Sequence, residues 1–149
     1  SELDIEIVAT IDELTRRRLG PLPGNIRAVP YVPLNALIPT CTAAIHHAGP
    51  GTTCTIARHG VPQVVLPWYF DEPYVARGLA DAGAGITLDP AEATGGAVRD
   101  SLRRLLGEPA FAVAAGRLRD ELLAQPAANE LAALLPDLTA IHRGSPAAG

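Results

Sequence analysis

A short apolar run, residues 43–45, ends in a polar turn that leads into a helical segment. Residues 46–53 of this turn read His-His-Ala-Gly-Pro-Gly-Thr-Thr. A strand, a glycine-containing turn and a helix in this order are typical of α/β domains. They also leave the first N–H groups of the helix without a partner inside the helix. The turn therefore predicts an α/β fold with a phosphate-type anion site at the end of a strand.

The residue types in the turn suit a diphosphate. Gly49 and Gly51 carry no Cβ, so a ligand can approach their backbone closely. Thr52 and Thr53 add hydroxyl donors, and His47 adds an imidazole donor. The alternative is an ordinary glycine turn of an α/β domain, in which the histidines have no ligand. The paired histidines, the two threonines and the strand–turn–helix context favour the phosphate site.

Apolar runs alternate with helical segments along the rest of the chain. Strands are expected at residues 4–10, 26–29, 43–46, 62–67 and 85–88. Helices are expected at residues 12–19, 34–38, 52–59, 72–82, 97–106, 109–124 and 126–142. This alternation predicts a parallel, doubly wound, Rossmann-like sheet.

Polar clusters follow three of the predicted strands, at residues 31–33, 47–53 and 68–72. In doubly wound sheets, ligands lie outside the carboxyl ends of the strands. The three clusters are therefore expected to form one site.

Composition and charge exclude several classes of function. The net charge is −4, from 12 basic and 16 acidic residues, and no basic run indicates nucleic-acid binding. No apolar run approaches the ~20 residues that a membrane span needs. Cys41 and Cys54 are interpreted as reduced thiols of a cytoplasmic protein. A metal site at His46, His47 and Cys54 is disfavoured, because adjacent residues of an extended strand point to opposite faces, so no metal is expected.

The ordered clusters resemble the C-terminal, donor-binding domain of GT-B nucleotide-sugar glycosyltransferases. The likeness is greatest to the bacterial, family-1-like branch that glycosylates macrolides and anthracyclines. The matching run covers about residues 29–90, and weaker similarity covers the rest. Its motifs are Val-Pro-Tyr-Val-Pro-Leu (29–34), the 46–53 turn, Gly-Val-Pro-Gln (60–63), Pro-Trp-Tyr-Phe-Asp-Glu (67–72) and Ala-Asp-Ala-Gly-Ala-Gly (80–85).

The resemblance implies a role for each matched position. Tyr31 occupies the place of the aromatic residue that stacks on the nucleobase, and Val32 would offer backbone hydrogen bonds to the base edge. His47 matches the histidine that contacts the donor diphosphate, and residues 51–53 match the turn that cradles it. The alternatives are a strand-end aromatic packed on a loop for Tyr31, and a histidine satisfied by a backbone carbonyl for His47.

Two positions bear on the sugar and the nucleotide. Asp71 and Glu72 match the pair that holds sugar hydroxyls, but the family usually has Gln where this chain has Glu72. A carboxylate only accepts hydrogen bonds, which suits an amino or deoxygenated sugar. The alternative for Glu72 is an acid favoured by a helix N-terminus. Enzymes of this group that use UDP-sugars often carry Glu at the position of Thr55, so a dTDP-sugar is expected in preference to a UDP-sugar.

By this resemblance, the chain is the donor-binding part of an inverting glycosyltransferase. Such an enzyme would move a deoxysugar from a dTDP- or UDP-sugar to a small natural-product aglycone, without a metal. The catalytic histidine and the acceptor pocket belong to the N-terminal domain, so this chain contains no catalytic residue and is expected to be inactive alone. A homodimer or an activator protein are the partners left open.

Other functions remain as alternatives. The runner-up is a non-catalytic, nucleotide-sugar-binding partner of a glycosyltransferase. A sugar-nucleotide epimerase is less favoured, because the motif run continues to Asp71. A purely structural domain would leave the three clusters unexplained.

The domain organisation follows from the same resemblance. Residues 1–125 are expected to form a partial donor-binding domain that lacks the first strand and helix. The absent strand would be central, so a gap flanked by unpaired backbone is expected. Residues 126–143 form a helix whose apolar stripe is expected to pack on an absent N-terminal domain, and residues 144–149 form a flexible tail. His59 and His142 are expected to be ordinary surface or packing residues.

Overall fold

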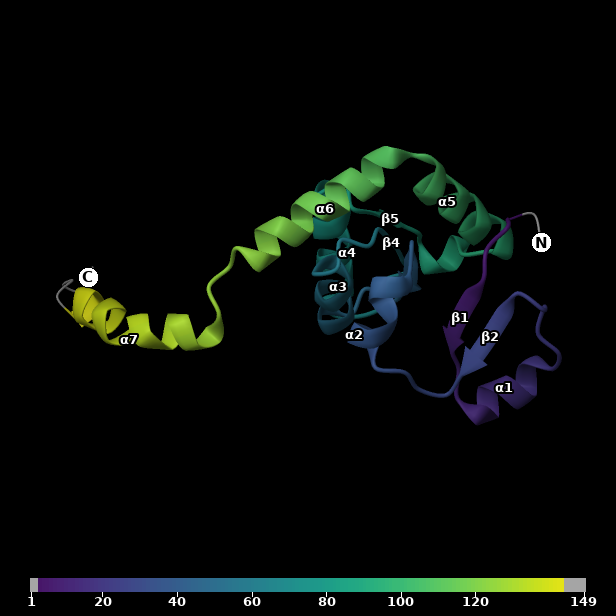
Figure 1. The fold of residues 1–149 in the computed structure, drawn as a ribbon, viewed down its shortest axis with the longest axis horizontal. Coiled ribbons are helices and arrows are strands. Elements are labelled where there is room, and N and C mark those ends of the chain that lie inside the picture. The colour runs from purple at the N-terminus through teal and green to yellow at the C-terminus, as the bar shows by residue number, and fades with distance from the viewer. Residues whose placement is uncertain (1–2, 144–149) are drawn as a thin grey trace.

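Short parallel strands alternate with helices in the computed structural model, which describes residues 3–143 (Figure 1). The strands are β1 (Ile7–Thr10), β2 (Ile26–Val29), β3 (Ala44–His46), β4 (Gln63–Val65) and β5 (Gly85–Thr87). The α-helices are α1 (Glu13–Leu19), α2 (Leu34–Leu37), α3 (Pro50–Ala57), α4 (Glu72–Asp81), α5 (Gly95–Gly107), α6 (Pro109–Leu123) and α7 (Ala128–Arg143). Two 3-10 turns are η1 (Ile38–Thr40) and η2 (Pro90–Glu92). The predicted α/β alternation is confirmed.

The strands form two parallel sheets. β1 pairs with β2 from Ile7↔Ile26 to Thr10↔Val29, and β3, β4 and β5 form the second sheet in that order. A doubly wound sheet of order 3-2-1-4-5-6 would give this arrangement if its central position were empty. The predicted gap is therefore present, between the edges of β1 and β3.

Both faces of the three-stranded sheet are covered, as a doubly wound fold requires. Val64 packs in one cluster with Leu102 and Leu105 of α5, whereas Val65 packs in another with Leu79 of α4 and Ala115 of α6. Val64 and Val65 are both 0% exposed. Because neighbours in a strand point to opposite faces, these two valines anchor the two helical layers.

Element boundaries differ from the prediction by a few residues, for local reasons. α3 begins at Pro50, two residues earlier than expected, because proline at the first helical position has a suitable φ and needs no donor. α5 begins at Gly95, because the Thr94 hydroxyl accepts a hydrogen bond from the N–H of Ala97 at 3.1 Å. β1 begins at Ile7 rather than residue 4, because pairing with β2 starts there.

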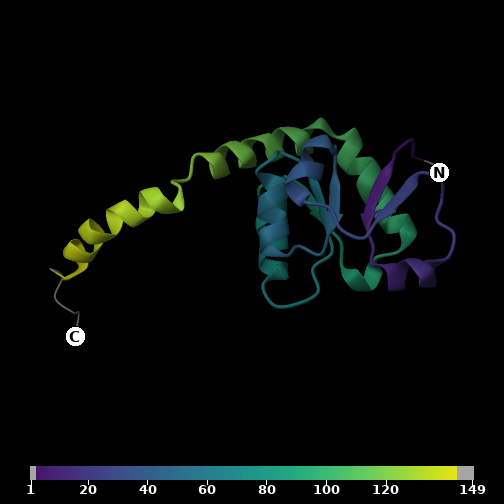
Figure 2. The ribbon, with the colours of Figure 1, turned by 60° about the horizontal axis from the view of Figure 1, so that its bottom comes forward.

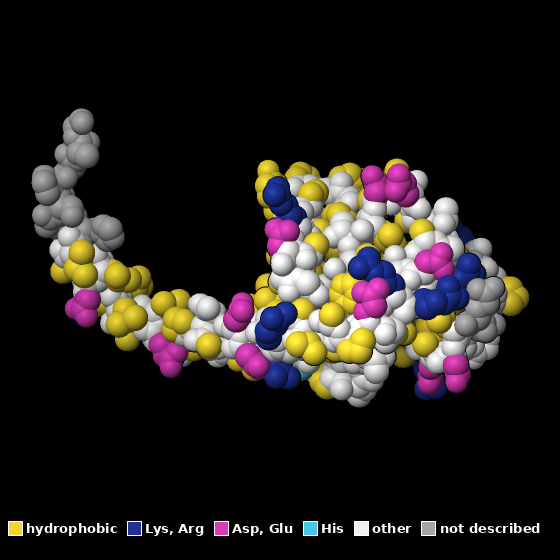
Figure 3. All heavy atoms as spheres, turned by 90° about the horizontal axis from the view of Figure 1, so that it is seen from above, with side chains coloured by type: hydrophobic (Ala, Val, Ile, Leu, Met, Phe, Trp, Pro, Cys, Tyr) yellow, Lys and Arg dark blue, Asp and Glu magenta, His cyan; other side chains and the backbone are white. Residues whose placement is uncertain are grey.

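Helix α6 packs on the body of the domain, and α7 extends beyond it as an arm that stands clear of the body (Figure 2). Hydrophobic side chains are visible along this arm (Figure 3). In α7 they are Leu131, Leu134, Leu135, Leu138 and Ile141, which are 46–66% exposed. None of the helices in the described range could cross a membrane. The expected tail at 144–149 and the side chain of His142 lie outside the described residues.

Candidate functional site

The turn between β3 and α3 reverses at Ala48, a buried residue with φ 69°. A non-glycine residue in this left-handed region is uncommon and needs support from its surroundings. The support is a hydrogen bond from the Ala48 N–H to Nδ1 of His46, at 3.1 Å. Within this turn the side chain of His47 remains 60% exposed.

His46 connects this turn to the neighbouring strand. Because its Nδ1 accepts from Ala48, its Nε2 carries the proton and donates to Oε1 of Gln63 at 2.7 Å. The Gln63 side chain is fully buried, and its Nε2 lies 3.5 Å from the carbonyl oxygen of Thr53 in α3. Burial lowers the pKa of His46, so the neutral ring is favoured. We call residues His46, Gln63 and Thr53, which join both ends of the turn, the polar bracket.

The N-terminus of α3 is open. Its N-cap, Gly49, has no side chain, and its carbonyl accepts both the N–H and the hydroxyl of Thr53, at 2.9 and 3.0 Å. The N–H groups of Gly51 and Thr52 have no partner among the described residues. A Cβ built on Gly51 would meet no atom within 4 Å. Two donors therefore face open space at the positive end of a helix, which is the environment that an anion prefers.

His47 lies beside this helix end and approaches α4. Its Nε2 is 3.8 Å from Oε1 of Glu72. A Cβ on Gly49 would come within 2.7 Å of the same Nε2, so glycine leaves room for the ring. His47, Gly49 and Glu72 are thus brought together, as the sequence predicted from their positions at strand ends.

Glu72 also organises the loop after β4. Its Oε2 accepts the N–H of Trp68 at 2.6 Å and the N–H of Tyr69 at 3.0 Å. These hydrogen bonds, the one from Trp68 most strongly, lower the pKa of the Glu72 carboxyl. The carboxylate therefore stabilises the loop at the start of α4. This agrees with the alternative that Glu72 is an acid favoured by a helix N-terminus, and its contact with a sugar stays a prediction.

The same loop presents aromatic side chains to solvent. Phe70 has φ 51° and is 95% exposed, and its ring centroid lies 6.3 Å from that of Tyr69. Phe70 and Ala48 are the non-glycine residues with positive φ in the described part of the chain. Each lies in a turn that follows a strand of the site, which is where backbone strain is expected in binding sites.

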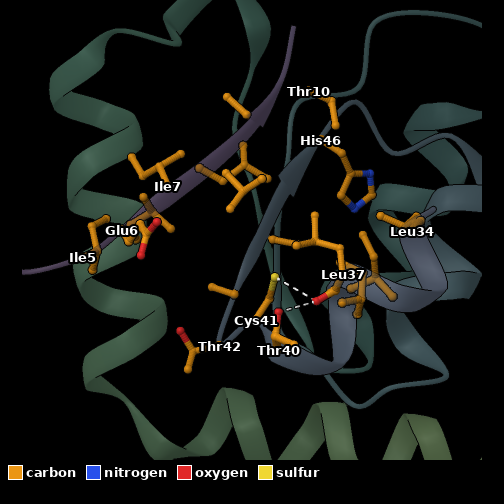
Figure 4. A pocket seen from close by; sticks show the side chains of 18 of the residues that line it. Ile5, Glu6, Ile7, Thr10, Leu34, Leu37, Thr40, Cys41, Thr42 and His46 are labelled. Carbon is orange, nitrogen blue, oxygen red and sulfur yellow. Dashed lines mark hydrogen bonds between the residues drawn. The ribbon is translucent and has the colours of Figure 1, made fainter. Parts of the chain in front are cut away.

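Tyr31 and Val32 lie at the same end of the fold, on the other side of the gap. Figure 4 shows Thr10 and His46, the last residues of β1 and β3, at the same end of the cavity between the sheets. Thr10 pairs with Val29, so the segment that follows Val29 leaves at this end as well. Tyr31 is 80% exposed, as a residue that stacks on a ligand would be.

The remaining predicted residues fall into two groups. The Thr53 hydroxyl is engaged by Gly49, and the hydroxyl of Thr55 donates to the Gly51 carbonyl at 2.8 Å, so both point into α3. Asp71 is exposed, and its side chain makes no capping bond to α4. The roles of these residues toward a ligand stay predictions. Within residues 3–143, no three side chains are grouped to hold a metal ion.

The polar bracket was not predicted from the sequence. Its signal is Gln63, a single amide in the otherwise apolar run Val-Pro-Gln-Val-Val-Leu. A buried amide needs hydrogen-bond partners, so such a residue indicates a polar contact across the sheet. The partner, His46, becomes evident only once the register of β3 on β4 is known.

Comparisons with known proteins identify the family of this chain. Residues 1–138 match the family described as erythromycin biosynthesis protein CIII-like, C-terminal domain. TDP-daunosamine transferase DnrS of Streptomyces peucetius is 46% identical over 145 residues, covering 96% of this chain and 34% of that protein. The 10-deoxymethynolide desosaminyltransferase of Streptomyces venezuelae is 44% identical over 147 residues, covering 99% and 34%.

Solved structures give the same picture. Glycosyltransferase VinC in complex with dTDP superposes with a TM-score of 0.83 at 40% identity, covering 96% of this chain and 36% of that one. Spinosyn rhamnosyltransferase SpnG complexed with thymidine diphosphate superposes with a TM-score of 0.78 at 42% identity, covering 93% and 37%. The chain thus spans about a third of the length of the relatives it matches.

Proposed function

Since the chain belongs to the family of erythromycin biosynthesis protein CIII-like C-terminal domains, we propose that it is the donor-binding part of an inverting glycosyltransferase. The donor is a dTDP-deoxysugar, and the acceptor is a small natural-product aglycone. The observation that carries the proposal is the open N-terminus of α3. The free N–H groups of Gly51 and Thr52 lie there beside the exposed imidazole of His47.

This geometry suits a diphosphate leaving group. In the proposed reaction, the acceptor hydroxyl oxygen attacks the anomeric carbon from the face opposite the diphosphate. The bond from that carbon to the diphosphate breaks, and its electron pair leaves with the diphosphate. Donors already aimed at the oxygens where charge develops stabilise this step without reorganisation. His47 and the first N–H groups of α3 are such donors, and the polar bracket holds the turn that presents them.

The proton of the acceptor hydroxyl needs a base. We assign this role to none of the described residues of the chain. We place the base in the N-terminal domain of a longer polypeptide. The 149-residue chain is therefore expected to bind the donor and to transfer no sugar by itself. The apolar stripe of α7 (Leu131, Leu134, Leu135, Leu138 and Ile141) would pack against that same domain.

The preference for dTDP over UDP rests on position 55. The Thr55 hydroxyl donates to the Gly51 carbonyl within α3, so it offers no carboxylate to a ribose 2′-hydroxyl. Three of the similar proteins described above carry TDP in their names or were solved with a thymidine nucleotide: DnrS, VinC and SpnG. Asp71, whose carboxylate is exposed, is the residue we assign to the sugar hydroxyls, with Glu72 holding the loop beside it.

Calorimetric titration with dTDP and UDP tests the proposal. The wild-type chain should bind dTDP more tightly than UDP. His47→Ala should weaken dTDP binding by about tenfold, the loss of roughly one charge-assisted hydrogen bond. His59→Ala is the matched control, because His59 lies in the turn after the C-terminal end of α3, and this variant should bind dTDP as the wild type does. Equal affinities of the His47→Ala and wild-type chains would contradict the diphosphate assignment.

A further inference from the structure

The aromatic side chains of this chain are distributed unevenly. The sequence contains six: one tryptophan, three tyrosines and two phenylalanines. Phe111 is buried in the core, whereas the other five are 59–95% exposed. Three of these five are consecutive, Trp68, Tyr69 and Phe70, and we call them the aromatic loop. A buried ring removes a large apolar area from water, so three neighbouring exposed rings indicate a surface that another molecule covers.

The backbone of the aromatic loop is held in one conformation. Oε2 of Glu72 accepts the N–H groups of Trp68 and Tyr69. The N–H of Glu72 in turn donates to the carbonyl of Tyr69 at 3.0 Å. Phe70 follows with φ 51°, which a bulky residue adopts only where the surrounding structure maintains it. The fold therefore maintains a strained backbone at a residue whose apolar ring remains in solvent.

The aromatic loop lies beside the residues that we assign to the diphosphate. Glu72 holds the loop through Oε2, and its other oxygen, Oε1, lies 3.8 Å from Nε2 of His47. A sugar on a diphosphate at the start of α3 is covalently attached at this position, so it lies close to His47 and Glu72. Phe70 and Asp71 immediately precede Glu72, and both are exposed. Their side chains are therefore available to the sugar.

Phe70 and Asp71 offer chemically different contacts. The ring of Phe70 has no polar atom, and its faces carry partial negative charge, which attracts the slightly positive C–H groups of a sugar. The carboxylate of Asp71 accepts hydrogen bonds from hydroxyl groups. A hydroxyl group placed against the Phe70 ring would leave water without gaining a partner, which is unfavourable. A sugar that carries hydrogen in place of that hydroxyl avoids this penalty.

We infer that Phe70 is a specificity-determining residue of the donor site. Its ring stacks on the apolar face of the deoxysugar, while Asp71 binds a hydroxyl that the sugar retains. This role rests on the proposed function, because the diphosphate site fixes the position of the sugar. It supplies a physical reason for the choice of a deoxysugar, which the diphosphate contacts do not give, since every dTDP-sugar carries the same diphosphate.

The other exposed rings suit this role less well. The ring of Tyr69 has a neighbour on each side, with the Trp68 and Phe70 centroids 6.2 and 6.3 Å away. Phe70 is at the end of this row and has the largest exposed fraction. Tyr74 belongs to α4, outside the loop that Glu72 holds. Phe70 is thus the ring with the most open surface next to Asp71.

Calorimetric titration with dTDP, dTDP-glucose and dTDP-6-deoxyglucose tests the role of Phe70. The two sugar nucleotides differ by one hydroxyl group. The wild-type chain should bind dTDP-6-deoxyglucose about fivefold more tightly than dTDP-glucose. Phe70→Ala should weaken the binding of dTDP-6-deoxyglucose about fivefold and leave the affinity for dTDP unchanged. A residue that only supported the fold would change the affinities for all three ligands together.

Three further variants serve as controls. Phe70→Gly also removes the ring, but glycine adopts φ 51° without strain, so it should lose the preference as Phe70→Ala does. Phe70→Tyr keeps the ring and should retain the preference for the deoxysugar. Tyr74→Ala removes another highly exposed ring from α4 and should bind all three ligands as the wild type does.

The possible failures are distinguishable. Absence of dTDP binding by the wild-type chain would contradict the proposed function, and the role of Phe70 with it. Where dTDP binds, equal wild-type affinities for the two sugar nucleotides would overturn only the role of Phe70. A Phe70→Ala chain that keeps the preference would overturn it as well, as expected if the aromatic loop covers the acceptor.

Two other outcomes would also overturn the role of Phe70. Equal weakening of all three ligands by Phe70→Ala would show that the ring acts on the nucleotide or on the fold. A wild-type dimer in sedimentation that dissociates in Phe70→Ala would show that a second copy of the chain covers the aromatic loop.

Discussion

Nε2 of His46 and Oε1 of Gln63 lie 2.7 Å apart, across two neighbouring strands and 17 residues of sequence. With the bond from Ala48 to Nδ1 of His46, this contact fixes the tautomer of the ring. It also supports a turn that contains a strained residue. The stability of the core and the shape of the candidate site therefore depend on the same side chains.

Replacing Gln63 with leucine should destabilise the fold. The substitution keeps the volume roughly constant but leaves the buried Nε2–H of His46 without an acceptor. The expected cost is about 1–3 kcal/mol in the free energy of unfolding, measured by urea denaturation. Gln125→Leu, at an exposed glutamine after α6, is the control and should change stability little. Equal stability of both variants would mean that the bracket contributes nothing.

Stability should fall as the pH drops through the range where free histidine is protonated. Burial lowers the pKa of His46, so the unfolded state binds a proton that the folded state resists. The contribution of His46 to the free energy of unfolding is fully present above a pH of about 6.5 and is lost progressively below it. Urea denaturation between pH 7.5 and 5.5 measures the slope of the free energy of unfolding against pH. His46→Asn, which retains an acceptor for Ala48 without titrating, should flatten it, whereas His59→Ala should leave it unchanged.

Alanine at two glycines should separate folding from binding. A Cβ on Gly85 would come within 2.6 Å of the Gln63 carbonyl and of Leu79, so Gly85→Ala should destabilise by about 1–3 kcal/mol. Gly51→Ala meets open space in a helix, and should stabilise by up to about 1 kcal/mol. Its new methyl group nevertheless lies at the proposed diphosphate site, so dTDP binding should weaken. Thermal unfolding and calorimetry give the two readouts, and a Gly51→Ala chain that binds dTDP normally would contradict the site.

Removing the Glu72 carboxylate should release the loop after β4. Glu72→Ala deletes the acceptor for the N–H groups of Trp68 and Tyr69, whereas Glu72→Gln keeps a side-chain oxygen that can serve both. Trp68 is the single tryptophan of the sequence, so its fluorescence anisotropy reports on this loop alone. Anisotropy should fall for the alanine variant and remain near the wild-type value for the glutamine variant.

The fluorescence anisotropy of Trp68 should fall at low pH, and the pKa of Glu72 determines where it falls. The hydrogen bonds lower the pKa of Glu72. The carboxylate thus holds the loop throughout the neutral range and above the ordinary carboxyl pKa, and the loop loosens only as the pH falls through the lowered value. A wild-type anisotropy that already falls near pH 6 would contradict the assignment of this signal to Glu72.

The alternation of elements could be predicted from the sequence, because apolar runs and glycine or proline boundaries act locally. The start of α3 was misplaced by two residues, since Pro50 was assigned to the turn although it serves as the first helical residue. The grouping of His47 with Glu72 was predictable as well, because parallel strands bring their carboxyl ends to one edge.

Contacts that depend on register could not be predicted in this way. The pairing of His46 with Gln63 requires β3 and β4 to align with Ala44 opposite Gln63, and a one-residue slip would turn the imidazole to the other face. Nor does the sequence show that the Thr53 and Thr55 hydroxyls bond back within α3, because a threonine in the first turns of a helix has more than one acceptor within reach.

The position of α7 changes what its leucines do for the molecule. A helix of 16 residues that stands apart from the body has only its own propensity to maintain it, and isolated helices of this length are marginal in water. Its apolar stripe contributes free energy only when another surface covers it. The helical content of α7 should therefore report whether its apolar stripe is covered by another surface. It should rise when the stripe is covered and fall when it is exposed, while the body of the domain stays folded in both states.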